Sequence, residues 1–161
     1  MNKLSELNDL WKKAKIRTVD TATEQQVSEF EATHNLIIPH DLRGYFVAVN
    51  GTDRLPDNEF YTFCTLEQFQ PITKVLDAWK NGIPRHSDVL EKIGSPQNCF
   101  VFADYSIYLF AYAIRLYPTE SAQNEVYAIC GGEYRIIAKS FSEFIDLYLQ
   151  QADELTFCLI A

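Results

Sequence analysis

The sequence lacks the long apolar run that a membrane-spanning helix requires. Nowhere do about 18 consecutive apolar residues occur, and the opening stretch MNKLSELNDLW contains no uninterrupted apolar segment of the kind that forms a signal peptide. Glycine and proline are also scarce, with 6 of each, which excludes a collagen-like fibre and a low-complexity tract. These absences predict a folded cytoplasmic protein without a membrane partner.

Motifs for common catalytic and cofactor chemistry are missing as well. The chain contains no GxGxxG or GxxxxGK phosphate loop, no CxxC pair and no HExxH motif. Its histidines, His34, His40 and His86, lack the close spacing of a metal site. Asp41 and Arg43 are interpreted as structural, because a carboxylate near a helix N-terminus is stabilised by the helix dipole. The sequence therefore predicts neither a cofactor nor a metal ion.

The cysteines stand singly in apolar surroundings. Cys64, Cys99, Cys130 and Cys158 are separated by 35, 31 and 28 residues, and free cysteine is among the side chains most often buried. We therefore expect four reduced core thiols, in preference to a disulfide framework or a metal site. A site in which Cys99 meets a histidine in space stays open, although the apolar neighbours of Cys99 argue against it.

Positive charge is in short supply. Lys and Arg total 14 against 22 Asp and Glu, which gives a formal net charge of -8 at pH 7. Nonspecific binding to nucleic acid depends on Lys and Arg that displace counterions from phosphate, so this composition argues against a nucleic-acid partner. An acidic surface would instead attract a basic protein partner. The alternative is a solvated surface that only keeps the protein soluble.

A length of 161 residues suits one domain, which we expect to span residues 1–161, and 47% hydrophobic residues can fill its core. Apolar periodicity predicts helices at 2–15, 23–34, 39–49, 71–80 and 140–149. Segments rich in β-branched and aromatic residues predict strands at 60–64, 99–103, 107–116, 125–130 and 133–138. Helices first, strands next and a helix last indicate an α+β fold. In it, an antiparallel sheet of about five to six strands packs against the N-terminal helices and a C-terminal helix.

Local sequence signals support the expected start or end of several of these helices and strands. Thr23 and Gln26 have the spacing of a capping box, and Gly51 in Asn50-Gly51 suits the left-handed end of a helix. Gly131-Gly132 indicates a two-residue hairpin. The stretch from Ile107 to Ile114 is apolar on both alternating sides, so we expect both faces of its strand to be covered. One helical turn is expected near residue 66, and a connection with at most a short helix is expected from residue 83 to residue 98.

Acidic residues gather in two segments expected to be loops, beside tyrosines expected to be exposed. Loop side chains on a rigid scaffold can reach a partner, and tyrosine offers a large contact area at low entropic cost. A further pair, directly after the strand at 99–103, either points into a groove or forms a simple turn. Tyrosine also favours strands, so an ordinary structural role is the alternative. The candidate partner-binding residues are Asp53, Asp57, Glu59, Tyr61, Asp104, Tyr105, Tyr117, Glu120 and Glu125.

Three segments resemble the SUKH superfamily, in particular its Smi/Knr-type members. Ile38-Pro39-His40-Asp41-Leu42-Arg43-Gly44-Tyr45, followed by Val49-Asn50-Gly51, resembles a family helix that starts at a Leu-Pro-x-Asp/Glu-Leu-like step and ends at Asn-Gly. Phe102-Ala103-Asp104-Tyr105, leading to Tyr112-Ala113-Ile114, is similar to the central strands, and residues 132–144 resemble the closing hairpin and helix. The similarity covers most of residues 20–150. This chain departs from the pattern in having Ile38 where the family often has Leu, and in a sheet unusually rich in Tyr.

The resemblance implies an α+β domain that binds proteins. Bacterial members of the family are commonly immunity proteins that neutralise a cognate toxin, often a nuclease or deaminase, and fungal relatives are regulatory interaction hubs. Neither role needs a catalytic residue, so we expect no enzymatic activity. The leading hypothesis is a bacterial immunity protein that binds a basic toxin domain. A regulatory adaptor is the alternative and a hydrolase a distant third, and the sequence does not indicate an oligomeric state.

Overall fold

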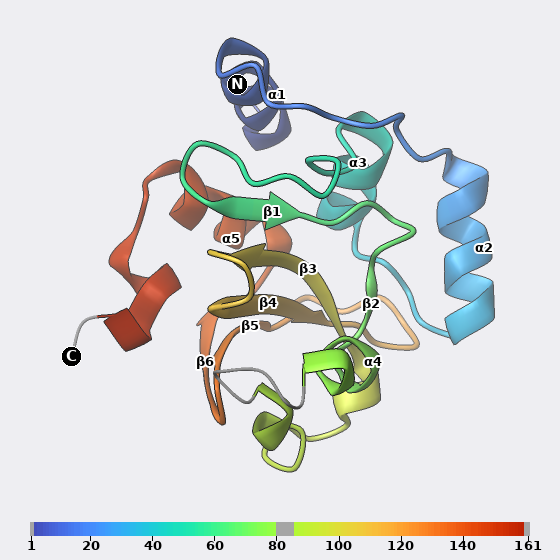
Figure 1. Ribbon diagram of the computed structural model, residues 1–161. Coiled ribbons are helices and arrows are strands. Elements are labelled where there is room, and N and C mark those ends of the chain that lie inside the picture. The colour runs from blue at the N-terminus through green and yellow to red at the C-terminus, as the bar shows by residue number, and fades with distance from the viewer. Residues whose placement is uncertain (1, 80–85, 160–161) are drawn as a thin grey trace.

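The computed structural model describes residues 2–79 and 86–159 and confirms the α+β class (Figure 1). Within these ranges the α-helices are α1 (Lys3–Lys13), α2 (Glu24–His34), α3 (His40–Ala48), α4 (Ile72–Val75) and α5 (Phe141–Leu149). The strands are β1 (Tyr61–Phe63), β2 (Gln70–Pro71), β3 (Cys99–Tyr105), β4 (Phe110–Arg115), β5 (Val126–Cys130) and β6 (Glu133–Ala138). Short 3-10 helices are η1 (Asp77–Trp79), η2 (His86–Val89), η3 (Pro96–Asn98) and η4 (Asp153–Leu159).

One antiparallel sheet contains all six strands, in the order β1-β3-β4-β5-β6, with β2 also paired to β3. Strands β1 and β2 share one edge of β3: Tyr61 pairs with Tyr105 at its end, and Gln70 pairs with Val101 near its start. The remaining strands form a meander in which each strand pairs with the next. The expected antiparallel sheet is therefore confirmed.

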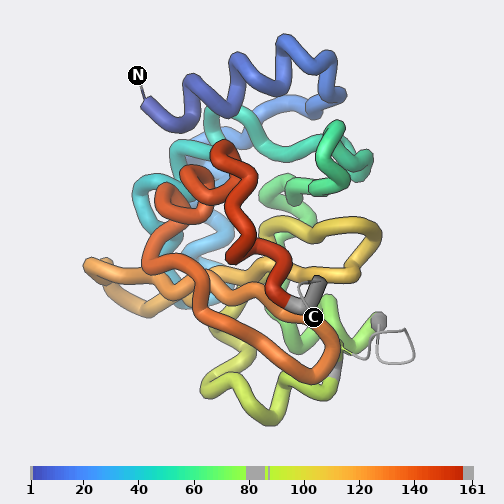
Figure 2. The backbone as a smooth tube through the Cα atoms, turned by 90° about the vertical axis from the view of Figure 1, so that its left-hand side faces the viewer, coloured from blue at the N-terminus to red at the C-terminus, as the bar shows by residue number. Residues whose placement is uncertain are grey.

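Helices α1, α2, α3 and α5 cover one face of the sheet, and α4 and η2 cover the other (Figures 1 and 2). On the first face, Phe102 packs against Phe144 of α5 with ring centroids 4.8 Å apart. On the second, Ile72 and Val89 belong to the same buried cluster as Val101 of β3. Because each face of β3 and β4 has its own apolar cover, the expectation of a strand buried on both sides is confirmed.

The predicted helix caps are present. Thr23 Oγ1 accepts a hydrogen bond from Gln26 N, and the Gln26 side chain accepts one from Thr23 N, which completes the capping box at α2. Asp41 Oδ2 accepts a hydrogen bond from Ser142 N at 2.8 Å, so a residue of α3 helps to cap α5. Arg43 forms ion pairs with two glutamates of α2. These contacts agree with a structural role for Asp41 and Arg43.

The strand expected from residue 107 begins only at Phe110, so that prediction is wrong at its start. Ser106, Ile107 and Tyr108 instead form a turn with φ of 51°, 55° and 61°. Two side-chain contacts hold it: Asp104 Oδ1 accepts a hydrogen bond from Tyr108 N, and buried His86 Nε2 contacts the Tyr108 carbonyl. Such contacts favour a left-handed turn over the local β-propensity.

Other element ends also differ from expectation. The strand expected at 60–64 is limited to Tyr61–Phe63, because Phe60 takes a left-handed φ of 70°. The helix expected at 71–80 is α4 followed by η1, and its expected end at residue 80 lies outside the described residues. The helical turn expected near residue 66 is a hydrogen-bonded turn, and β2 and η4 were not predicted. Within the described ranges, no helix combines the length and apolar composition that crossing a bilayer demands.

Candidate functional site

The candidate binding residues do not form one continuous surface. Asp57, Glu59, Tyr61 and Tyr105 line a common pocket, whereas Asp53 lines a separate groove. The remaining candidates lie elsewhere: Tyr117 and Glu125 form a contact, Glu120 lines a third hollow, and Asp104 is buried in β3. The structure thus brings Tyr105 next to Asp57, Glu59 and Tyr61, which the sequence had indicated as a separate acidic segment with its neighbouring tyrosine.

The shared pocket, which we call the tyrosine pocket, has a volume of about 280 Å³. It lies between α1, the turn before β1, the end of β3 and the C-terminal end of α5 with the segment that follows. Its tyrosines form a cluster in which the ring centroid of Tyr61 is 5.0 Å from that of Tyr105 and 5.2 Å from that of Tyr148. Its lining residues are Leu10, Trp11, Ala14, Ile16, Asp57, Asn58, Glu59, Tyr61, Tyr105, Tyr148, Leu149, Gln151, Ala152, Asp153 and Thr156.

Asp57 is a fixed part of this pocket rather than a mobile loop residue. Its Oδ1 accepts hydrogen bonds from Glu59 N at 2.8 Å and Tyr61 N at 2.9 Å, and its Oδ2 accepts one from the Tyr148 hydroxyl. Burial and this bond raise the pKa of Tyr148 well above its usual range. Trp11 Nε1 donates to the same hydroxyl at 3.0 Å. The carboxylate is therefore held in one orientation by the backbone turn and by α5.

The pocket is acidic without a compensating base. Glu59 and Asp153 are both exposed at its edge, and neither side chain forms a hydrogen bond or ion pair with a described residue. No Lys, Arg or His is among its described lining residues. The pocket therefore presents three carboxylates and several aromatic rings to a ligand.

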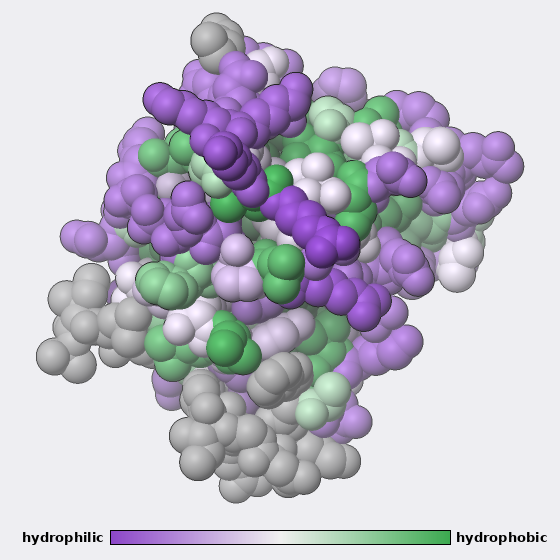
Figure 3. Space-filling model, turned by 45° about the horizontal axis from the view of Figure 1, so that its top comes forward, coloured by the Kyte–Doolittle hydropathy of each residue, from purple (hydrophilic) through white to green (hydrophobic). Residues whose placement is uncertain are grey.

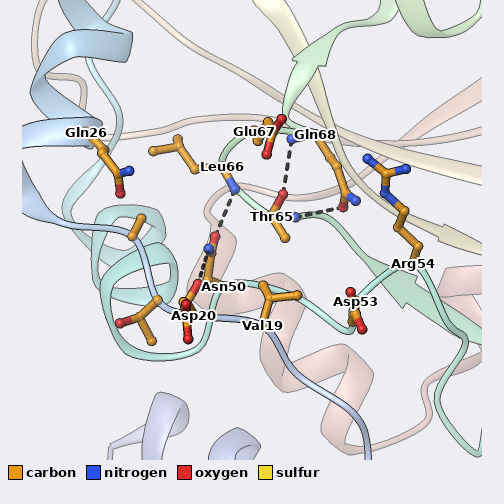
Figure 4. Close-up of a pocket in the computed structure, with 12 residues that line it drawn as sticks. Val19, Asp20, Gln26, Asn50, Asp53, Arg54, Thr65, Leu66, Glu67 and Gln68 are labelled. Carbon is orange, nitrogen blue, oxygen red and sulfur yellow. Dashed lines mark hydrogen bonds between the residues drawn. The ribbon is translucent and has the colours of Figure 1, made fainter.

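A second hollow is an open groove of about 800 Å³ next to Asn50 (Figure 4). Asn50 is 7% exposed, and its amide joins two segments: Nδ2 donates to Asp20 O, and Oδ1 accepts from Leu66 N, each at 2.8 Å. In Figure 4, Asn50 lies between these partners, with Asp53 and Arg54 on the same loop. Asp53 is paired with Arg17 at 2.6 Å. The Asn50-Gly51 motif is thus used to hold the fold together.

The second acidic segment lies at the opposite end of β4 from the tyrosine pocket. The Tyr117 hydroxyl donates to Glu125 Oε2 at 2.6 Å, and both side chains are half-buried. Burial and this bond raise the pKa of Tyr117 to about 12. Glu120 is exposed beside a small hollow of about 190 Å³ that Pro39 also lines. Tyr117 and Glu125 are therefore hydrogen-bonded to each other, and Glu120 is the accessible acidic residue of this segment.

Three candidates are less accessible than their sequence context indicated. Asp57, Tyr61 and Asp104 are 7%, 8% and 5% exposed, so the expectation of an exposed Tyr61 and a freely reaching Asp57 is wrong. For Asp57 and Tyr61 the cause is packing against Tyr148 of α5, and Asp104 is buried within β3 between its partners in β1 and β4. Burial raises the pKa of Asp104 to about 6, an effect that its hydrogen bond with Tyr108 N only partly offsets.

The thiols of Cys64 and Cys99 are unsuited to nucleophilic chemistry. Cys64 and Cys99 are buried, which raises their pKa values to about 12 and about 11 and keeps both protonated at neutral pH. Cys130 is half-buried, not fully buried as expected, and the side chain of Cys158 lies outside the described part of the structure. Among the described residues, no three His, Cys, Asp or Glu side chains come together as metal ligands.

Sequence reasoning missed the wall of the tyrosine pocket that the two ends of the chain provide. Trp11, Tyr148 and Asp153 line it, but Trp11 and Tyr148 occupy helix positions whose spacing indicates only a buried apolar stripe. The one local signal is that both residues are polar at the tip. Buried Trp and Tyr usually have a hydrogen-bond partner, which indicates a polar group nearby.

The face seen in Figure 3 is mostly hydrophilic, and its hydrophobic surface is divided into small patches. Large exposed apolar side chains among the described residues are scattered over different elements: Leu10, Leu55, Phe60, Ile107 and Ile136. Isolated apolar residues of this kind are normal on a protein surface. The tyrosine pocket is therefore the best-built candidate site.

Comparison with known proteins agrees with this fold. The model of the SMI1 / KNR4 family (SUKH-1) matches residues 21–147, a range that contains α2, α3, all six strands and most of α5. No curated protein matches the chain. The matched range includes Asn50, whose side chain joins two segments, and the capped start of α5. The chain belongs to the SMI1 / KNR4 family (SUKH-1).

Proposed function

We propose that this protein is a non-catalytic binding domain, and specifically an immunity protein that binds and neutralises a basic toxin domain. The family supports a protein-binding role, because its bacterial members are commonly immunity proteins. The observation that carries the proposal is the tyrosine pocket, whose described lining contains three carboxylates and three tyrosines and no Lys, Arg or His.

This combination suits a protein partner. Tyrosine is enriched among the residues that dominate binding energy at interfaces, and carboxylates that are not neutralised by the chain steer a basic partner during encounter. The net charge of -8 acts in the same direction over a longer range. An enzyme that acts on nucleic acid presents a basic groove to phosphate, so an acidic domain can occupy that groove in place of the substrate.

Neutralisation by this route is stoichiometric and involves no covalent step. The protonated state of the buried Cys64 and Cys99 thiols supports a protein without a nucleophile at these positions. One molecule of the domain would block one toxin for as long as the complex lasts. Protection then depends on the dissociation rate of the complex rather than on turnover.

The test begins with the neighbouring genes. A toxin gene whose C-terminal domain is basic should lie directly upstream, and co-expression of this chain with that domain should restore growth. Purified chain should bind a catalytically inactivated form of the domain in a 1:1 complex by calorimetry. The absence of both a toxin neighbour and any protection would contradict the immunity role and favour a regulatory adaptor.

A further inference from the structure

The tyrosine pocket has a negative charge that no Lys, Arg or His among its described lining residues neutralises. Asp57 is 7% exposed and accepts three hydrogen bonds, yet it forms no ion pair with a described Lys, Arg or His. A carboxylate has about four acceptor positions, so about one is left for an incoming donor. Glu59 and Asp153 add two unpaired carboxylates at the edge. Buried charges in proteins are usually paired, which indicates a cation as the missing partner.

The size of the pocket restricts that cation to a single side chain. A volume of about 280 Å³ lies just below the range for small-molecule sites, which are usually ~300–1,000 Å³. The walls are aromatic, with Tyr61 and Tyr105 in mutual contact. A planar cation can stack against such rings while its N–H groups reach the carboxylates. Lysine has a point charge and lacks this planar fork.

Most of the pocket lies outside the part of the chain that matches the family. Of its described lining residues, only Asp57, Asn58, Glu59, Tyr61 and Tyr105 fall within residues 21–147. The others come from α1 and the residues just after it, and from the end of α5 onward. The two ends of the chain therefore complete a site on the common fold. Because these segments lie outside the family match, the pocket is suited to recognising a particular partner rather than to maintaining the common fold.

We propose that the tyrosine pocket binds an arginine side chain of the protein partner. This rests on the proposed function in one respect, namely that the partner is a basic protein. The guanidinium stacks on Tyr105, donates to the carboxylates of Glu59 and Asp153, and approaches the remaining acceptor position of Asp57. The arginine is then an anchor residue in a pocket, which is the arrangement typical of a binding hot spot.

The first test needs no toxin. N-acetyl-arginine amide is titrated into the isotopically labelled protein, and backbone amide shifts are recorded by NMR. The isosteric neutral probe N-acetyl-citrulline amide and the N-acetyl-lysine amide serve as comparisons. We expect the arginine probe to shift the amides of Glu59, Tyr61, Tyr105 and Asp153 with a dissociation constant on the order of 1 mM. The lysine probe should bind several-fold more weakly and the citrulline probe not measurably.

Variants distinguish the pocket from general charge. Glu59→Gln with Asp153→Asn should weaken the arginine probe at least ~5-fold, since each lost carboxylate removes a charge-assisted hydrogen bond. Asp88→Asn with Glu91→Gln changes the net charge equally at exposed positions outside the pocket and should leave binding unchanged. Folding of each variant is checked by circular dichroism, and the replaced side chains have no hydrogen bonds to other described residues.

A second pair of variants tests the aromatic wall. Tyr105→Leu should weaken the arginine probe several-fold, and Tyr105→Phe should preserve binding, because the ring rather than the hydroxyl makes the cation contact. No shift with the arginine probe at tens of millimolar, or equal binding of all three probes, would overturn the proposal. Equal weakening by the two double variants would also overturn it.

The two proposals fail separately. If the arginine probe binds as expected but no toxin is neutralised, the pocket stands and the immunity role is wrong. If the toxin is neutralised equally by the wild type and by the Glu59→Gln and Asp153→Asn double variant, the immunity role stands and the pocket proposal is wrong.

Discussion

The indole Nε1 of Trp11 donates a hydrogen bond to the hydroxyl of Tyr148 at 3.0 Å, which joins α1 to α5 across 137 positions of the chain. That hydroxyl in turn donates to Asp57 at the floor of the tyrosine pocket. The three side chains form a hydrogen-bonded chain next to an otherwise apolar cluster. These hydrogen bonds connect α1 and α5 to Asp57, one of the pocket residues that lie within the family match.

Replacement of Tyr148 by Phe should destabilise the protein. The change removes only the hydroxyl, but it leaves buried Asp57 Oδ2 and Trp11 Nε1 without this partner, so we expect the free energy of unfolding to fall by about 1–3 kcal/mol. Urea denaturation measures it. Tyr105→Phe is the control, with an expected change within about 0.5 kcal/mol. Equal effects in the two variants would contradict a specific stabilising role for the hydrogen bonds between Trp11, Tyr148 and Asp57.

The Asn50-Gly51 step should tolerate no side chain at its second position. Gly51 has a φ of +96°, and a Cβ there would lie 2.8 Å from the carbonyl oxygen of Phe63. We therefore expect Gly51→Ala to reduce the free energy of unfolding by about 2–4 kcal/mol. Gly94→Ala is the matched control, because an added Cβ meets nothing within 4 Å. A similar loss in both variants, measured by thermal unfolding, would contradict this explanation.

Asp104 should make the protein less stable as the pH rises. Its pKa is about 6 in the folded protein against an ordinary value of 3.8, so the folded state binds more protons than the unfolded state between these limits. Stability from this group is greatest below about pH 4 and is lost by about pH 6. Since each pKa unit corresponds to about 1.4 kcal/mol, the loss is about 3 kcal/mol.

Asp104→Asn removes this titration and keeps an oxygen that can accept from Tyr108 N. The variant should match the wild type near pH 4 and exceed its stability by up to about 3 kcal/mol at pH 7. Urea denaturation at half-unit intervals of pH gives the difference between the two curves. Parallel curves for the two proteins would mean that Asp104 is not desolvated in the folded state.

The buried thiols should react only when the protein unfolds. Burial raises the pKa of Cys64 to about 12 and that of Cys99 to about 11, so both lack accessible thiolate at pH 8. Labelling with iodoacetamide, followed by peptide mass spectrometry, should modify these two residues in urea but not in buffer within an hour. Labelling of either residue at the rate of a free thiol in buffer would show that its part of the sheet opens readily.

The parts of the fold that could be predicted from sequence depend on signals close together in the chain. The capping box at Thr23, the Ser140 cap and the Gly131-Gly132 hairpin each involve residues within a few positions of one another. The turn at residues 106–108 was missed because it depends on a side-chain contact from His86 and on the carboxylate of Asp104. Strand β2 was missed because only its pairing with β3 defines it.

The candidate site was predictable in part for the same reason. Asp57, Glu59 and Tyr61 lie in one short segment, and Tyr105 reaches them because β1 pairs with the end of β3. The burial of Asp57 and Tyr61 was not predictable, since it results from Tyr148, 91 positions away from Asp57. The sequence also gave no sign that α1 and α5 would complete one pocket, because apolar periodicity identifies a buried face and not the element that covers it.

Charge reversal should separate the two acidic segments by their effect on association with the proposed toxin partner. Glu59→Lys at the tyrosine pocket and Glu120→Lys at the other end of β4 change the net charge equally, and both positions are exposed. If the partner approaches the pocket, Glu59→Lys should slow association about 3–10-fold at 50 mM salt, and Glu120→Lys should slow it by less than about 2-fold. Stopped-flow fluorescence measures both rates.

Salt provides the control for this comparison. The screening length falls from about 14 Å at 50 mM to about 4 Å at 500 mM salt, so the difference between Glu59→Lys and the wild type should shrink at the higher concentration if it arises during encounter. A difference that persists at 500 mM belongs to contacts in the bound complex and should appear in the dissociation rate instead. Equal slowing by the two variants would mean that the net charge alone attracts the partner. No slowing by either, with association unaffected by salt in the wild type, would mean that the acidic surface has no part in binding.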